Sequence, residues 1–158
     1  MTPAIKLLQK KNIAHQVLNY SSDPSAASYG LEAAEKLGLS PQEVFKTLVA
    51  SVDGKQLVVA ILPVDQQLSL KKLAKAAGGK KAAMADPAEV ERTTGYVLGG
   101  VSPLGQKKSL PTFIHLTAQK LGKVHVSAGK RGLEIQLNPL DLQQLTRAGF
   151  TALTSSES

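Results

Sequence analysis

The sequence predicts an α+β fold in which helices pack around a mixed, mostly antiparallel β-sheet or a partly closed β-barrel. The first observation is an apolar run rich in β-branched residues, from Val44 to Val52, which ends at Asp53-Gly54. Such a run is typical of a strand that enters a tight hairpin, and Gln56–Leu62 is the expected return strand. The second observation is that helical patterns alternate with strand pairs whose connections are too short for helical crossovers.

The other elements follow from periodicity and from capping and turn residues. Thr2-Pro3 begins an amphipathic helix that ends near Asn12, and Ser40-Pro41-Gln42-Glu43 is a capping box that predicts another helix start. Further helices are expected at residues 31–37, 69–77, 87–93 and 139–147. Further strands are expected at residues 15–20, 80–85, 112–116, 123–127 and 133–137. Residues 154–158 are expected to form a frayed tail.

Bulk properties narrow the class of protein. The 158 residues are expected to form a single domain, and they contain no cysteine that could form a disulfide or act as a nucleophile. No apolar run is long enough to span a bilayer, and the first residues lack the pattern of a secretory signal, so a cytoplasmic protein is expected. The net charge of +7 indicates an anionic partner, most plausibly nucleic acid. The basic residues form dispersed pairs that either line one surface track or only maintain solubility.

Lys46 is the most informative residue of the first hairpin. Side chains alternate along a strand, so Lys46 projects on the same side as Val44, Leu48 and Ala50. An ammonium among apolar groups requires an anionic or hydrogen-bonding partner. The strand pattern alone favours the ordinary alternative, a lysine whose stem lies on apolar surface while its head reaches water.

Other motifs carry weaker signals. The segment Gly95–Gly105 is rich in glycine, and its N–H groups could hold a phosphate or a carbonyl, although a tight structural turn is an equal alternative. Ser127–Gly132 is expected to be a hairpin turn with a basic tip. His15, His115 and His125 lack metal-ligand spacing, so no metal or other cofactor is expected. Among the aromatic residues, Tyr20 is a candidate ligand contact and Phe45 a core or pocket-wall residue.

Several segments together resemble the YbaK-type aminoacyl-tRNA deacylases, which are related to the editing domain inserted in bacterial prolyl-tRNA synthetases. The resemblance runs in order along almost the whole chain. The segments that carry it are residues 2–4, 36–39, 44–48, 84–87, 94–96, 99–108 and 126–133.

The resemblance implies a hydrolase that removes a wrong amino acid from tRNA, chiefly cysteine from proline tRNA, with tRNA and prolyl-tRNA synthetase as partners. It places the family's essential lysine at Lys46. It also implies that the pocket side includes Gly99, Gly100, Val101, Ser102, Pro103, Ser127, Ala128, Gly129 and Glu134. Tyr20, Phe45 and Thr47 are expected to complete the substrate-binding residues. Glu134 is a mild departure, because aspartate is expected there in close relatives.

The chemistry that the resemblance implies is substrate-assisted. The cysteinyl thiol attacks its own carbonyl and leaves as a cyclic thioester, while Lys46 and the N–H groups of residues 99–102 position the ester and stabilise negative charge. Two alternatives stay open. One is a module that binds the tRNA acceptor end or assists a synthetase without hydrolysis, and the other is a deacylase for another small amino acid.

Overall fold

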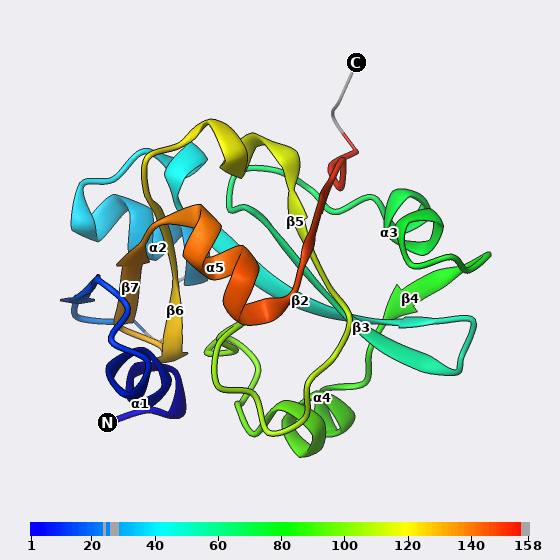
Figure 1. Cartoon of the computed structure of the whole chain (residues 1–158), viewed down its shortest axis with the longest axis horizontal. Helices are drawn as coiled ribbons and strands as arrows, with labels where there is room; N and C mark the ends of the chain where they lie inside the picture. Colours follow the sequence, from blue (N-terminus) through cyan, green and yellow to red (C-terminus); the bar gives the residue numbers. More distant parts are fainter. Residues whose placement is uncertain (24, 26–28, 156–158) are drawn as a thin grey trace.

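In the computed structural model, which describes residues 1–23, 25 and 29–155, the strands form two sheets that are not closed into a barrel (Figure 1). The α+β fold class is therefore confirmed, with the strands divided between two sheets. The larger sheet has five strands in the order β4-β2-β3-β5-β8, and the smaller has three in the order β1-β7-β6.

The hairpin of β2 (Phe45–Val52) and β3 (Gln56–Pro63) forms the centre of the larger sheet. Asp53 and Gly54 both have positive φ, 55° and 64°, as a two-residue hairpin turn requires. The other strands of this sheet are β4 (Ala82–Met84), β5 (Thr112–His115) and β8 (Gly149–Thr151). β4 is antiparallel to β2 from Ala50 onward, whereas β5 is parallel to β3 and β8 is parallel to β5. The sheet is mixed, as the sequence predicts.

The smaller sheet is entirely antiparallel. It contains β1 (His15–Asn19), β7 (Leu133–Leu137) and β6 (Val124–Lys130). The β6–β7 pairing shifts in register between Ser127 and Lys130, so the hairpin tip departs from regular pairing. Arg131 and Gly132 form the hairpin turn, which is shorter than the expected Ser127–Gly132 because β6 continues to Lys130.

In the described part of the chain, five α-helices surround the sheets and two short 3₁₀ turns connect elements. The helices are α1 (Pro3–Lys10), α2 (Tyr29–Leu37), α3 (Leu70–Ala76), α4 (Pro87–Thr94) and α5 (Pro139–Thr146), and the 3₁₀ turns are η1 (Pro41–Glu43) and η2 (Leu116–Lys120). Thr2, Ser69 and Asn138 cap their helices by accepting main-chain N–H groups through their side-chain oxygens. α3 lies beside β4, whereas α2 lies at the opposite end of the molecule near β6 and β7 (Figure 1).

The core follows the alternation of side chains on β2. Phe45 and Val49 belong to the larger buried cluster, which also contains residues of α1 and of both sheets. Ala50 and Val52 belong to a second cluster on which α3 packs. The register Phe45↔Pro63 keeps this alternation in phase along the hairpin. The opposite faces predicted for Phe45 and Lys46 are therefore those that the structure has.

Three local features differ from what the sequence predicts. The capping box at Ser40 begins only the 3₁₀ turn η1, without a side-chain cap, because the chain is already extended at Val44 before β2. The strand β8 was not expected, since its three residues carry almost no periodicity. Thr154 and Ser155 are not frayed: Thr154 is buried in a bridge with Leu68, and Ser155 donates its N–H to Gln67 at 2.9 Å. Residues 156–158 lie outside the described part of the chain.

Across the described residues, none of the helices is both long enough and apolar enough to cross a membrane.

Candidate active site

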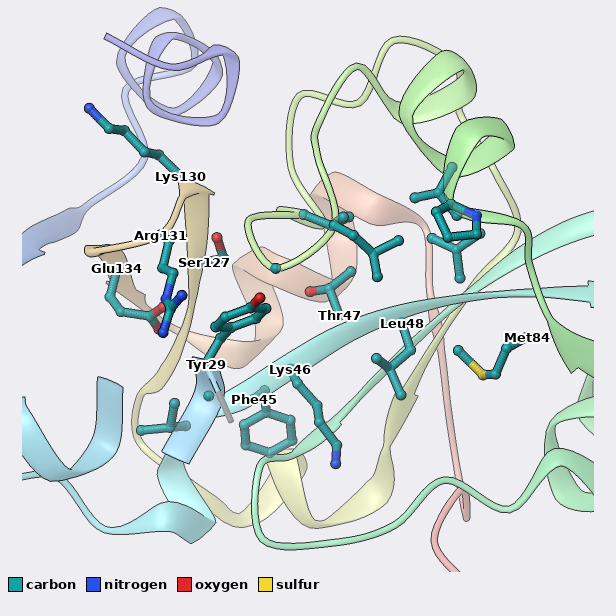
Figure 2. A pocket seen from close by; sticks show the side chains of 18 of the residues that line it. Tyr29, Phe45, Lys46, Thr47, Leu48, Met84, Ser127, Lys130, Arg131 and Glu134 are labelled. Carbon is teal, nitrogen blue, oxygen red and sulfur yellow. The ribbon is translucent and has the colours of Figure 1, made fainter. Parts of the chain in front are cut away.

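A pocket of about 640 Å³ lies beside β2 and opens toward the β6–β7 hairpin (Figure 2). Of the residues that the sequence singles out, those that line it are Tyr20, Phe45, Lys46, Thr47, Gly99, Val101, Ser127 and Glu134. Gly100, Ser102, Pro103, Ala128 and Gly129 are not among its lining residues. The lining also includes apolar residues of β2, β4 and α4, such as Leu48, Met84 and Val90. The pocket thus joins segments that are distant in sequence.

The position of the pocket follows from the pairing of β2. Along this strand, Val44 accepts a hydrogen bond at its carbonyl from Val64, on the β3 side, at 2.9 Å. Val49 instead accepts from Ala85, on the opposite side, at 3.1 Å. The main-chain groups of successive residues alternate between the two edges of a strand. The N–H and C=O groups of residues 45, 47 and 49 therefore point away from β3. β4 covers that edge only from Ala50 onward, so the edge beside the pocket is open.

Lys46 is half-buried and projects from the opposite face of β2 to Thr47 (Figure 2). Its burial lowers the pKa of the ammonium, and the nearby Asp65 carboxylate partly opposes that effect. The side chain therefore offers a poorly solvated positive charge at the wall of the pocket. Such a charge attracts an anionic group or the oxygen of a polarised carbonyl.

Glu134 is the most perturbed acid that lines the pocket. Its side chain is 6% exposed, and burial raises the pKa of the carboxyl to about 8. Its Oε2 atom and the Oγ1 atom of Thr47 are buried, and neither has a hydrogen-bond partner among the described residues. Burial also raises the pKa of Tyr20, with Glu134 as a further cause. Buried polar atoms are normally paired, so these two oxygens are candidates for hydrogen bonds with a ligand.

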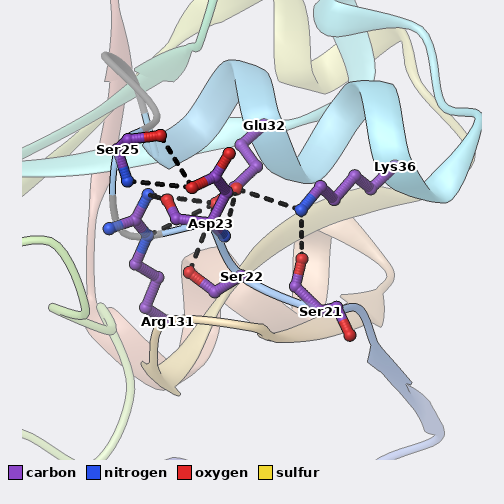
Figure 3. Close-up of polar contacts among 7 residues, drawn as sticks. All are labelled: Ser21, Ser22, Asp23, Ser25, Glu32, Lys36 and Arg131. Atoms are coloured by element: carbon purple, nitrogen blue, oxygen red, sulfur yellow. Dashed lines mark hydrogen bonds and ion pairs between the residues drawn. The ribbon is translucent and has the colours of Figure 1, made fainter.

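A cluster of polar residues borders one side of the pocket (Figure 3). This rim cluster consists of Asp23, Glu32, Lys36 and Arg131. The Glu32 carboxylate accepts the Asp23 N–H at 2.6 Å and forms ion pairs with Lys36 and Arg131, both at 3.2 Å. Arg131 also donates to the Asp23 carbonyl at 2.5 Å, and its guanidinium carbon lies 3.9 Å from the centre of the Tyr29 ring. The hydrogen bond from Asp23, followed by the two cations, keeps the pKa of Glu32 below its ordinary value.

The glycine-rich segment contributes shape more than free donors. Gly100 donates its N–H to the Val97 carbonyl at 3.0 Å. This N–H is therefore not available to a ligand, contrary to the expectation that it could hold a phosphate or a carbonyl. Ser102 is fully buried, and its hydroxyl accepts the Leu104 N–H at 3.2 Å. Gly99 has φ of +91° and lies so close to Tyr29 that an added Cβ would be 2.4 Å from the ring. This segment therefore forms a wall of the pocket that depends on close approach to Tyr29.

Two of the histidines, His115 and His125, are buried and hydrogen-bonded within the fold. His125 is fully buried between the Glu43 carbonyl, 3.3 Å from Nδ1, and the Gln136 amide, 3.0 Å from Nε2. His115 accepts the Leu153 N–H at 3.1 Å through Nδ1. Within the described part of the chain, no group of three or more His, Cys, Asp and Glu residues could hold a metal ion.

Tyr29 and Arg131 are site residues that sequence reasoning did not select. The spacing of Glu32 and Lys36 predicts their ion pair, but Arg131 is 99 positions away from Glu32. The basic pair Lys130-Arg131 was a signal for this position. No local pattern indicates that Arg131 pairs with Glu32 while Lys130 is exposed.

Comparisons with known proteins identify the family of the chain. A family model described as an aminoacyl-tRNA editing domain matches residues 23–145. The chain is 39% identical over 158 residues to "Putative Cys-tRNA(Pro)/Cys-tRNA(Cys) deacylase EbsC" of Enterococcus faecalis, covering 99% of this chain and 94% of that protein. It is 33% identical over 106 residues to "Multifunctional Ser/Thr-tRNA deacylase ProXp-y" of Escherichia coli, covering 65% of this chain and 64% of that protein. A crystal structure described as that of "a putative trans-editing enzyme for prolyl tRNA synthetase" superposes with a TM-score of 0.80 at 24% identity. That match covers 97% of this chain and 93% of the other.

Proposed function

The chain belongs to the aminoacyl-tRNA editing domain family, and on this premise we propose that it deacylates misacylated tRNA, chiefly cysteinyl-tRNA(Pro). The observation that carries the proposal is the pocket, which combines a poorly solvated cation, free buried oxygens and no activated nucleophile. Its volume of about 640 Å³ lies within the ordinary range for small-molecule sites, so it has room for an aminoacyl group and part of the terminal nucleoside.

None of the described residues that line the pocket is an activated nucleophile. Ser127 uses its hydroxyl to accept the Gly129 N–H at 3.1 Å, and none of the three histidines lines the pocket to activate it. The chain has no cysteine. Nucleophilic catalysis by a side chain requires a base within hydrogen-bond reach of the nucleophile. A substrate that carries its own thiol removes that requirement.

The proposed reaction therefore uses the cysteinyl thiolate. The sulfur attacks its own carbonyl carbon, the C–S bond forms, and the ester C–O bond breaks. The ribose oxygen leaves as the tRNA hydroxyl after it gains a proton, and water then opens the cyclic thioester to cysteine. Lys46 supports this step by holding the ester-bearing end of tRNA and stabilising negative charge on oxygen. Glu134, protonated near neutral pH, serves as a hydrogen-bonding partner for the substrate.

A second candidate substrate class follows from the similarity to the Ser/Thr-tRNA deacylase. A hydroxyl differs from a thiol by little in size, and a pocket of this kind discriminates weakly between such groups. Deacylation of seryl- or alanyl-tRNA at a rate comparable with that of cysteinyl-tRNA(Pro) would favour this broader activity.

The decisive experiment measures hydrolysis of Cys-tRNA(Pro) by the wild type, Lys46→Ala and Lys46→Arg. We expect the wild type to accelerate hydrolysis, Lys46→Ala to lose at least about tenfold in rate, and Lys46→Arg to recover only part of the loss, because a planar guanidinium does not reproduce a point-like ammonium. If the wild type binds the tRNA and leaves the ester intact, the non-catalytic alternative is correct.

The proposed partners are the acceptor end of tRNA and prolyl-tRNA synthetase, in the cytoplasm where aminoacylation takes place. The support is the positive net charge and the family's relation to that synthetase. A pull-down with prolyl-tRNA synthetase, with and without tRNA, tests the partnership. Capture in neither condition would contradict it.

A further inference from the structure

The edge of β2 that faces the pocket presents both main-chain groups of Thr47, with which no strand of the described residues pairs. Thr47 faces away from β3 by the alternation that Val44 and Val49 define, so its N–H and C=O both lie on the pocket side. β4 begins its pairing only at Ala50, and the bridge between Val44 and His125 precedes Thr47. Among the described residues, no strand therefore pairs with Thr47 on this side. An open strand edge is a ready template for pairing with a further chain.

An aminoacyl ester carries a hydrogen-bond donor for the C=O of Thr47 and an acceptor for its N–H. Its ammonium donates hydrogen bonds and its carbonyl accepts them, and both are attached to one Cα, as in a residue of a strand. In an antiparallel pair, two opposed residues exchange both hydrogen bonds, whereas a parallel strand bonds to two different residues. One aminoacyl group can therefore satisfy both main-chain groups of Thr47 only in the antiparallel arrangement.

We infer that Thr47 holds the aminoacyl group of the substrate as an opposing antiparallel strand residue would. Its C=O accepts a hydrogen bond from the α-ammonium, and its N–H donates to the ester carbonyl. This placement rests on the proposed function and specifies the binding mode within the same pocket. The N–H also polarises the carbonyl that the substrate thiol attacks, so Thr47 acts at the reacting atoms.

This arrangement provides a partner for the buried Oγ1 atom of Thr47. Side chains of directly opposed residues in an antiparallel pair lie on the same face of the sheet. The side chain of an L-aminoacyl group therefore lies on the face of Thr47, whose Oγ1 is buried and has no partner among the described residues. A thiol or hydroxyl of the substrate fits beside that oxygen. A D-aminoacyl group would direct its side chain to the face of Lys46 instead.

The same arrangement sets the direction of the tRNA. The carboxyl side of an antiparallel partner runs toward the Phe45 end of β2, so the ester oxygen and the ribose leave in that direction. Figure 2 shows Tyr29 and Arg131 beyond that end, whereas Leu48 and Met84 lie toward the other. Lys130, on the tip of the β6–β7 hairpin, is exposed at the same side. The anionic tRNA thus leaves the pocket on the side where the exposed Lys130 lies, which favours its binding there.

The test changes the substrate and the protein in turn. The first measurement compares Cys-tRNA(Pro) with 3-mercaptopropionyl-tRNA(Pro), which keeps the thiol and the ester but lacks the α-amino group. Each enzymatic rate is divided by the spontaneous hydrolysis rate of the same ester. We expect the acceleration to fall at least about tenfold for the analogue, and we expect D-Cys-tRNA(Pro) to be a similarly poor substrate.

The protein variants are Thr47→Pro and Thr47→Ala. Both lose the hydroxyl, but only proline removes the N–H, and an edge position whose N–H is unpaired tolerates proline. We expect Thr47→Pro to be at least about tenfold slower than Thr47→Ala, with unfolding curves that show both variants folded. Equal acceleration of Cys-tRNA(Pro) and of the analogue that lacks the α-amino group would overturn the placement, whether or not Thr47→Pro folds. If the wild type accelerates neither, the proposed function itself fails.

Discussion

The buried carboxyl of Glu134 couples the pocket to the stability of the whole chain. In the free protein its pKa is raised to about 8 from an ordinary value of 4.5, and the cause is burial. The folded state therefore holds this proton more tightly than the unfolded state. The contribution is fully present below about pH 4.5, is lost as pH rises, and is exhausted above about pH 8. A shift of this size corresponds to a free energy of the order of 5 kcal/mol.

Glu134→Gln removes that titration, so its stability relative to wild type is expected to rise with pH. Denaturant unfolding between pH 5 and pH 9 measures the difference, since titrations common to both proteins cancel. We expect the variant to gain at least about 2 kcal/mol over wild type across this range. The exposed Glu35→Gln provides a matched control that should show no such trend. A difference independent of pH would mean that the Glu134 carboxyl is not desolvated.

At the scale of elements, the glycine-rich segment and the rim cluster fix each other through Tyr29. Gly99 has φ of +91°, and a Cβ there would lie 2.4 Å from Cε2 of Tyr29. Gly99→Ala is expected to lower the free energy of unfolding by about 1–3 kcal/mol and to weaken substrate binding, because the backbone conformation is strained and the ring is displaced. Gly122→Ala is the control, since an added Cβ there meets nothing within 4 Å. Unchanged urea midpoints for both variants would contradict this packing.

Many of the helices and strands could be predicted from the sequence, because the signals for them are local. The hairpin at Asp53-Gly54 and the helices begun by Thr2, Ser69 and Asn138 depend on residues within a few positions of one another. The open edge of β2 could not be predicted, since it depends on where β4 stops pairing. The commitment of Arg131 to Glu32 was equally hidden, because it joins the β6–β7 hairpin to α2. Short β8 carried too few residues to show a pattern.

At the scale of the molecule, the pocket lies where an edge of one sheet faces a hairpin of the other. β2 supplies Lys46 and Thr47, whereas β6 and β7 supply Ser127 and Glu134. Both sheets contribute to one large buried cluster, so the distance across the pocket is fixed by the core. Only the three-dimensional arrangement separates the residues that line the pocket from Ser102 and Ala128, which are fully buried and do not line it.

The same scale decides which basic residues meet the tRNA. Lys130 is exposed on the hairpin beside the pocket, whereas Lys71 is exposed on α3, which lies beside β4 at the far end of the molecule (Figure 1). We expect Lys130→Ala to weaken tRNA(Pro) binding and to reduce the slope of log affinity against log salt by about one, because one phosphate contact and its released counterion are lost. Lys71→Ala should change neither. Titrations between 50 and 200 mM salt, a range that resolves such slopes, measure both. Equal slopes for the two variants would show that the basic pairs act only through overall charge.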